Sequence, residues 1–192
     1  MGRLHIEMGT PEAEPVTVDD AKTHLRVSHA EDDDYIGNLI AAAREWGESF
    51  QGRSWIVRSI DLYLDDWPQS PLALPRGPVQ DVSSVTFYTQ DGGEETLDSG
   101  TYWLDPAGRF NLTAGKVWPC DPLRESAGVK ITYTAGYGDT AADVPRRCRQ
   151  AVLLMVGHWY ENREEVVIGS RLVAQIPVAA EALLYQERVM PL

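Results

Sequence analysis

The most conspicuous candidate for a cation site is a run of three acids, Asp32-Asp33-Asp34. A calcium-binding loop needs alternating ligands, a central glycine and a distant glutamate, and this run lacks that pattern. Contiguous acids are instead favoured at the start of a helix, where the helix dipole and free backbone N–H groups attract negative charge. We therefore expect these residues to cap a helix, and we predict no metal site in the chain.

The remaining reactive residues do not indicate a nucleophilic enzyme or a nucleotide-binding protein. Cys148 falls on the apolar face of an expected helix, where a thiol is usually inert. His158, near the end of the same helix, is favoured there by the negative helix terminus. Gly136-Tyr137-Gly138 lacks the third glycine of the dinucleotide fingerprint and is not followed directly by a helix, so it predicts a turn. The sequence thus predicts no catalytic residue and no cofactor.

Acids and tryptophans leave one enzymatic alternative open. A glycosidase needs two carboxylates at a defined separation in a cleft, and this chain has 29 acidic residues and six tryptophans. The candidate acids fall on expected short strands and turns, namely Asp61, Asp65, Asp66, Glu94, Glu95, Asp98 and Asp105. A small carbohydrate-active enzyme, or a cytoplasmic binding module that uses the acids and tryptophans, therefore stays as the alternative.

The basic cluster Arg146, Arg147 and Arg149 lies in the first turns of an expected helix, where the helix dipole disfavours cations. A local rule broken without an evident gain marks a place to look for function. The arginines could pair with the chain's own acids, contact an acidic partner or contact phosphate. We favour internal pairing first and a partner contact, at a subunit interface, second.

Length, composition and charge exclude several classes of protein. The 192 residues are 43% hydrophobic, enough for a sizeable core, and no apolar run approaches the roughly 20 residues of a membrane helix. The net charge of −12 argues against a protein that grips nucleic acid phosphates. The acidity is confined to the first three quarters, because residues 144–192 carry six basic and five acidic residues.

Helical patterns lie toward the two ends of the chain, and strand-like patterns lie between them. Thr17 and Asp20 resemble a capping box, and Gln51-Gly52 is a helix stop. We predict an α+β fold: a helical core of two N-terminal helices plus a long C-terminal helix, with an antiparallel β insertion. The expected segments are an irregular N-terminal arm (1–16), the helical core (17–165) with its β insertion (about 54–135), and a C-terminal segment (166–192) with a short helix over 179–186.

Three stretches of the sequence, taken in order, form a recognisable layout. The first is PVTVDDAKTHLRV (15–27) with EDDDYI (31–36) and AAAREW (41–46). The second is ITYTAGYG (131–138) running into Val144-Pro145 and an apolar helix. The third is LLMVGHWYENRE (153–164). In their order and spacing, over most of the chain, these stretches resemble the head–tail connector (adaptor) proteins of long-tailed bacteriophages, prophages and gene transfer agents.

The resemblance implies a structural protein without catalysis. Such proteins form a homo-oligomeric ring, commonly dodecameric, under the portal protein of the DNA-filled head, and a tail-side connector or stopper protein docks on the other face. DNA passes through the channel without specific binding, and an acidic channel would repel it and let it slide. The expected location is the virion head–tail junction, after assembly in the host cytoplasm, with no membrane contact.

Within this family picture, the C-terminal segment is the expected portal contact. Its apolar residues have no long helix to bury them within one subunit, and such segments often become ordered on binding. Packing back onto the chain's own core is the alternative. Under the portal interpretation, deleting residues 170–192 should abolish portal binding and leave the fold intact. The residues expected to contact the portal are Ile168, Leu172, Val173, Ile176, Leu183 and Leu184.

Overall fold

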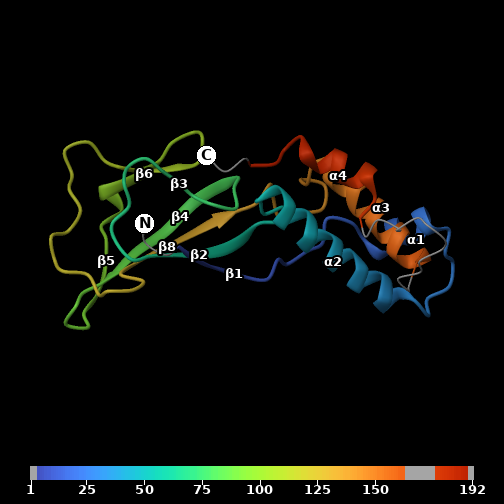
Figure 1. Ribbon diagram of the computed structural model, residues 1–192, viewed down its shortest axis with the longest axis horizontal. Coiled ribbons are helices and arrows are strands. Elements are labelled where there is room, and N and C mark those ends of the chain that lie inside the picture. Colours follow the sequence, from blue (N-terminus) through green and yellow to red (C-terminus); the bar gives the residue numbers. More distant parts are fainter. Residues whose placement is uncertain (1–3, 163–175, 190–192) are drawn as a thin grey trace, which may run out of the picture. The chain divides into compact units, whose positions relative to one another are not determined.

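The computed structural model describes residues 4–162 and 176–189, which fall into two compact units. The sheet unit contains residues 1–11 and 57–136, and the helical unit contains residues 12–56 and 137–192. Figure 1 shows the strands in one unit and the four helices in the other. The predicted α+β class, with antiparallel strands inserted between the second and third helices, is confirmed.

The first two helices begin and end at the residues that the sequence indicates. Helix α1 (Val18–Leu25) starts after Thr17, whose side chain accepts a hydrogen bond from the Asp20 backbone N–H, while the Asp20 carboxylate accepts one from the Thr17 N–H. Helix α2 (Asp33–Gln51) ends at Gly52, whose φ of 69° lies in the left-handed region that glycine tolerates. The expected capping box and helix stop are therefore confirmed.

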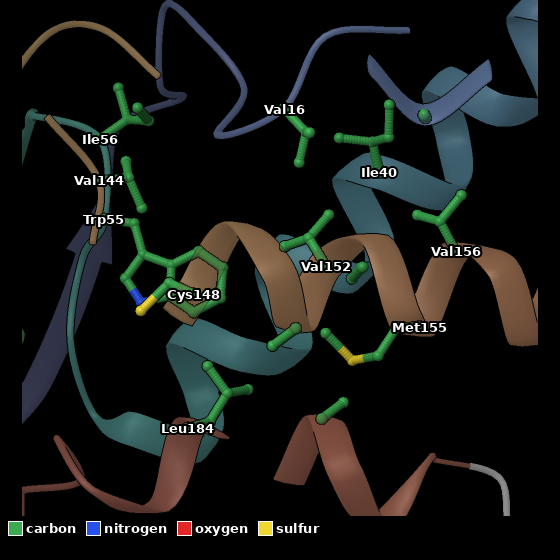
Figure 2. Close-up of a cluster of buried hydrophobic side chains, with 14 of the residues drawn as sticks. Val16, Ile40, Trp55, Ile56, Val144, Cys148, Val152, Met155, Val156 and Leu184 are labelled. Atoms are coloured by element: carbon green, nitrogen blue, oxygen red, sulfur yellow. The ribbon is translucent and has the colours of Figure 1, made fainter. Parts of the chain in front are cut away.

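Helix α3 (Arg146–Glu161) is the centre of the helical unit, because α1, α2 and α4 (Val178–Tyr185) all pack against it. Its expected apolar stripe is buried at Cys148, Val152, Met155 and Val156. Figure 2 shows Met155 pointing from α3 toward α4, and Leu184 of α4 in the same cluster as Trp55. The core therefore includes a helix from the C-terminal segment.

A five-stranded antiparallel sheet in the order β1-β2-β8-β4-β5 forms the larger part of the sheet unit. A three-stranded sheet, in the order β3-β7-β6, forms the rest. Strand β8 is central, and its residues alternate between buried and half-buried positions, which is the period-2 pattern of a half-covered sheet. The strands are β1 (His5–Met8), β2 (Arg58–Leu64), β3 (Leu72–Ala73), β4 (Val79–Tyr88), β5 (Glu94–Thr96), β6 (Tyr102–Leu104), β7 (Arg109–Leu112) and β8 (Val129–Ala135).

One local expectation is wrong, and a second holds in position but not in its hydrogen bond. Residues His5–Met8 are not irregular but form β1, which pairs with β2 from His5↔Tyr63 to Met8↔Ile60. Asp32 occupies the N-cap position of α2, yet its side chain makes no capping hydrogen bond and accepts one from the Tyr160 hydroxyl instead. In both cases a partner distant in sequence determines the local conformation.

Residues 4–162 and 176–189 hold no cluster of three His, Cys, Asp or Glu side chains able to ligate a metal ion. The helices of this part of the chain are all too short or too polar to span a bilayer. Of the acidic run, Asp33 accepts a hydrogen bond from Lys22 Nζ at 2.7 Å, and Asp34 is exposed.

Candidate interaction surfaces of the helical unit

The three arginines at the start of α3 have different environments. Arg147 is held within its own unit, because its Nη1 donates to Gln186 Oε1 at 3.0 Å and its Nε lies 3.4 Å from Glu187 Oε1. Arg146 is exposed, and Arg149 is half-buried. Neither Arg146 nor Arg149 forms an ion pair with any residue that the structure describes. Among the described residues, the expected pairing with the chain's own acids therefore holds for Arg147 and for neither of the other two.

Arg146 and Arg149 line a depression of about 500 Å³ between α1 and α3. The Nε atom of Arg149 is buried and has no hydrogen-bond acceptor among the described residues. A buried donor without a partner costs about 1–3 kcal/mol, so this side chain favours a ligand that supplies an acceptor. The lining residues are Val16, Asp20, Thr23, His24, Arg146, Arg149, Gln150 and Leu153.

The acidic member of this lining does not neutralise the arginines. Asp20 Oδ2 accepts from the Thr17 hydroxyl at 2.8 Å and lies 3.3 Å from the Thr17 backbone nitrogen, within the capping box of α1. Its carboxylate thus serves the helix start. The depression can consequently accept a carboxylate or another small anion with acceptor oxygens.

A buried polar network fixes α4 to the rest of the helical unit. Gln51 Oε1 accepts from Trp55 Nε1 at 2.7 Å, and Gln51 Nε2 donates to the Leu184 carbonyl at 2.9 Å. Glu187, just beyond the helix, accepts from the Tyr137 hydroxyl at 2.7 Å. Burial together with this hydrogen bond raises the pKa of Tyr137. Segments 130 residues apart in sequence are thereby joined through hydrogen bonds.

The residues predicted to contact the portal occupy different positions. Leu184 is fully buried in the helical core, and Ile176 and Leu183 are half-buried against that core. Ile168, Leu172 and Val173 lie outside the described residues. The exposed face of α4 instead presents Val178 and Tyr185, whose side chains are 74% and 57% exposed. The portal interpretation of these side chains remains a prediction.

The residues considered for catalysis have structural partners. Burial raises the pKa of the Cys148 thiol to about 12, and the thiol lies 3.8 Å from Gln51 Oε1. Trp55 is fully buried, and Trp67 stacks on Trp118 with ring centroids 5.0 Å apart. A thiol in this environment is a core residue, and these tryptophans pack inside their own units. Gly136-Tyr137-Gly138 forms the expected turn.

Sequence reasoning missed Gln51 and Glu187, the two residues that anchor α4. Gln51 was interpreted only as part of a helix stop, although it sits one turn after Gly47 on the buried face of α2. A polar residue in phase with an apolar stripe is a signal for a buried hydrogen-bonding role. Glu187 carries no comparable signal, because its partners lie far away in sequence.

The fold and this surface define a structural assembly protein, in which buried polar groups hold the helices together. Two arginines of α3 that form no ion pair with any described residue line a depression at the surface. The head completion protein family model matches residues 14–171. The chain belongs to the head completion protein family, a class of structural proteins that connect head and tail. Among curated proteins, none matches the chain significantly.

Solved structures show the same fold over nearly the whole chain. A chain from the neck of an empty GTA particle with C6 symmetry has a TM-score of 0.78 at 24% identity, covering 98% of this chain and 97% of its own. A chain from the virion of a native gene transfer agent (GTA) particle has a TM-score of 0.78 at 25% identity, covering 97% and 96%. A chain from the C12-symmetric neck of a native GTA particle has a TM-score of 0.70 at 25% identity, covering 97% of both.

Proposed function

We propose that this protein forms a ring at the head–tail junction of a phage-like particle, beneath the portal, and joins the DNA-filled head to the tail. The observation that carries this proposal is the family match together with a full-length likeness to chains of GTA necks and virions. The symmetry of those necks supports a ring with several copies of this chain. A dodecamer is the stoichiometry we propose.

The role we infer is mechanical, with no catalytic step of its own. The Cys148 thiol is buried, and burial raises its pKa to about 12. Most of the tryptophan surface considered for sugar binding is packed inside the two units. The net charge of −12 supports a channel through which DNA slides without specific binding. We further propose the portal protein and a tail-side connector or stopper protein as the neighbours on the two faces.

Quantification of the chain on purified, nuclease-resistant particles tests this function. We expect about one copy of the chain per portal subunit by mass spectrometry with isotope-labelled peptides, and little free protein outside particles after lysis. The host cytosol is the matched control. Abundant protein in the cytosol and none in particles would overturn the connector assignment.

The portal contact needs a more selective variant than a deletion. Removing residues 170–192 would also remove Ala180 and Leu184, which are fully buried in the helical core, so the expectation that this deletion leaves the fold intact is wrong. We propose the triple change Ile168→Asp, Leu172→Asp and Val173→Asp instead. Loss of portal binding with unchanged thermal unfolding would support the contact, and retained binding would contradict it.

A further inference from the structure

The depression between α1 and α3 is lined by charged groups that lack partners among the described residues. Two of its arginines lie at the N-terminal end of α3, where the helix dipole disfavours them. Arg149 Nε is buried without an acceptor, and neither Arg146 nor Arg149 pairs with an acid of the part of the chain that is described. An external carboxylate bound in the depression would offset the unfavourable helix dipole, supply an acceptor for Arg149 and pair with the two arginines.

A second surface of the same chain has the opposite character. Residues 79–96, which form β4, β5 and the turn between them, contain four acids and no lysine or arginine. Glu94 and Glu95 are exposed on β5 and form no ion pair with any described residue. Asp91, in the turn, is already engaged by the Thr89 hydroxyl. Glu94 and Glu95 are therefore two adjacent exposed carboxylates that follow the turn of this hairpin, on β5 (Figure 1).

We propose that the α1–α3 depression of one copy binds the β4–β5 hairpin of a neighbouring copy, with Glu94 or Glu95 accepting hydrogen bonds from Arg149 and Arg146. The inference rests on the proposed ring, because a closed ring of identical chains uses a heterologous interface built from two different patches. A bidentate arginine–carboxylate pair gives such a contact both strength and a fixed orientation.

A phosphate of DNA is a less suitable occupant than a carboxylate of a second copy. The lining includes Asp20, and the chain as a whole carries a net charge of −12. Both disfavour a polyanion more than a single carboxylate on a hairpin. The lining also includes the apolar side chain of Leu153, which a protein hairpin can contact.

Charge exchange in the particle-producing source tests the contact. Arg149→Glu should lower the number of chains per purified particle by about tenfold or more, because like charges at an interface cost several kcal/mol. Adding Glu94→Arg and Glu95→Arg in the same chain should restore incorporation. Arg147→Glu is not a suitable control, since Arg147 holds α4. Lys116→Glu, the same charge reversal at an exposed position outside the depression, is the matched control.

Cross-linking separates failure of this contact from failure of the proposed function. The background for cross-linking is Cys120→Ser. In it, Gln150→Cys in the depression combined with Thr96→Cys on β5 should yield a ladder of cross-linked subunits with a short bismaleimide. The control pair, Gln150→Cys with the exposed Val117→Cys, should yield no ladder. No ladder, from particles that contain the chain at ring stoichiometry, would overturn the contact and leave the ring. Loss of incorporation without rescue by the exchanged charges would also overturn it.

Discussion

Leu184→Ala should reveal whether α4 is part of the fold in the isolated chain. Leu184 is fully buried beside Ala180 and Met155 in the helical core, and its backbone carbonyl accepts the Gln51 side chain. Leucine to alanine removes three carbons, worth about 2.4 kcal/mol at ~0.8 kcal/mol each. The cavity left behind raises the expected loss to about 3–4 kcal/mol.

Urea unfolding followed by far-UV circular dichroism measures this loss. With a urea dependence of about 2–3 kcal/mol per molar, the midpoint of the helical unit should fall by about 1–2 M. Val178→Ala is the matched control, because Val178 lies on the same helix and its side chain is 74% exposed. It should change the free energy of unfolding by less than about 0.5 kcal/mol.

Two results would refute the reasoning. Equal effects of the two variants would mean that the buried and exposed faces of α4 do not differ in the isolated chain. A Leu184→Ala loss below about 0.5 kcal/mol would mean that α4 packs elsewhere, as a pure partner-binding segment would. Either result would return Leu184 to the set of residues proposed to bind the portal.

Three further outcomes follow from the structure. Cys148, whose pKa burial raises to about 12, should resist a thiol reagent at pH 8, whereas the exposed Cys120 should react within minutes, as counted by intact mass. Gly47→Ala should lower the thermal midpoint, because its new Cβ would lie 2.3 Å from the Trp55 ring, and scanning calorimetry would detect this. Asp105 accepts backbone and side-chain hydrogen bonds that lower its pKa in the folded protein. Its contribution to stability should therefore be complete above the unfolded-state pKa of about 3.9 and should be lost as the pH falls through the lower pKa of the folded state. Asp105→Asn should remove that part of the acid dependence in urea midpoints measured from pH 2 to 6.

Helix limits were predictable because local chemistry determines them. The Thr17 hydroxyl and the Asp20 carboxylate satisfy N–H groups within one turn, and Gly52 adopts a conformation that few other residues tolerate. Strand β8 was the clearest strand in the sequence because its residues alternate, and it is central in the sheet. These features depend on neighbours within a few residues.

Features that depend on distant partners were not predictable. Strand β1 has only one half-buried residue, Ile6, and exists through its hydrogen bonds to β2. The buried ion group of α2 is similar: Arg44 Nε donates to Glu14 Oε2 at 2.8 Å, and Arg44 Nη1 to Glu48 Oε2 at 3.2 Å. Burial opposes the charge of Arg44, but the two glutamates outweigh it and raise its pKa. A helical stripe alone would place such charges at the surface.

The arginines at the start of α3 show how an assembly protein can reveal its function without a catalytic motif. All three oppose the helix dipole, so each needs a compensating contact. Arg147 finds one in Glu187, which also receives the Tyr137 hydroxyl, and this contact serves the fold of a single chain. Arg146 and Arg149 have none in the described part of the chain. The two kinds of contact belong to different arginines. Reversing the charge of Arg149 should therefore weaken assembly without unfolding the subunit. Reversing the charge of Arg147 should destabilise the subunit and weaken assembly as well.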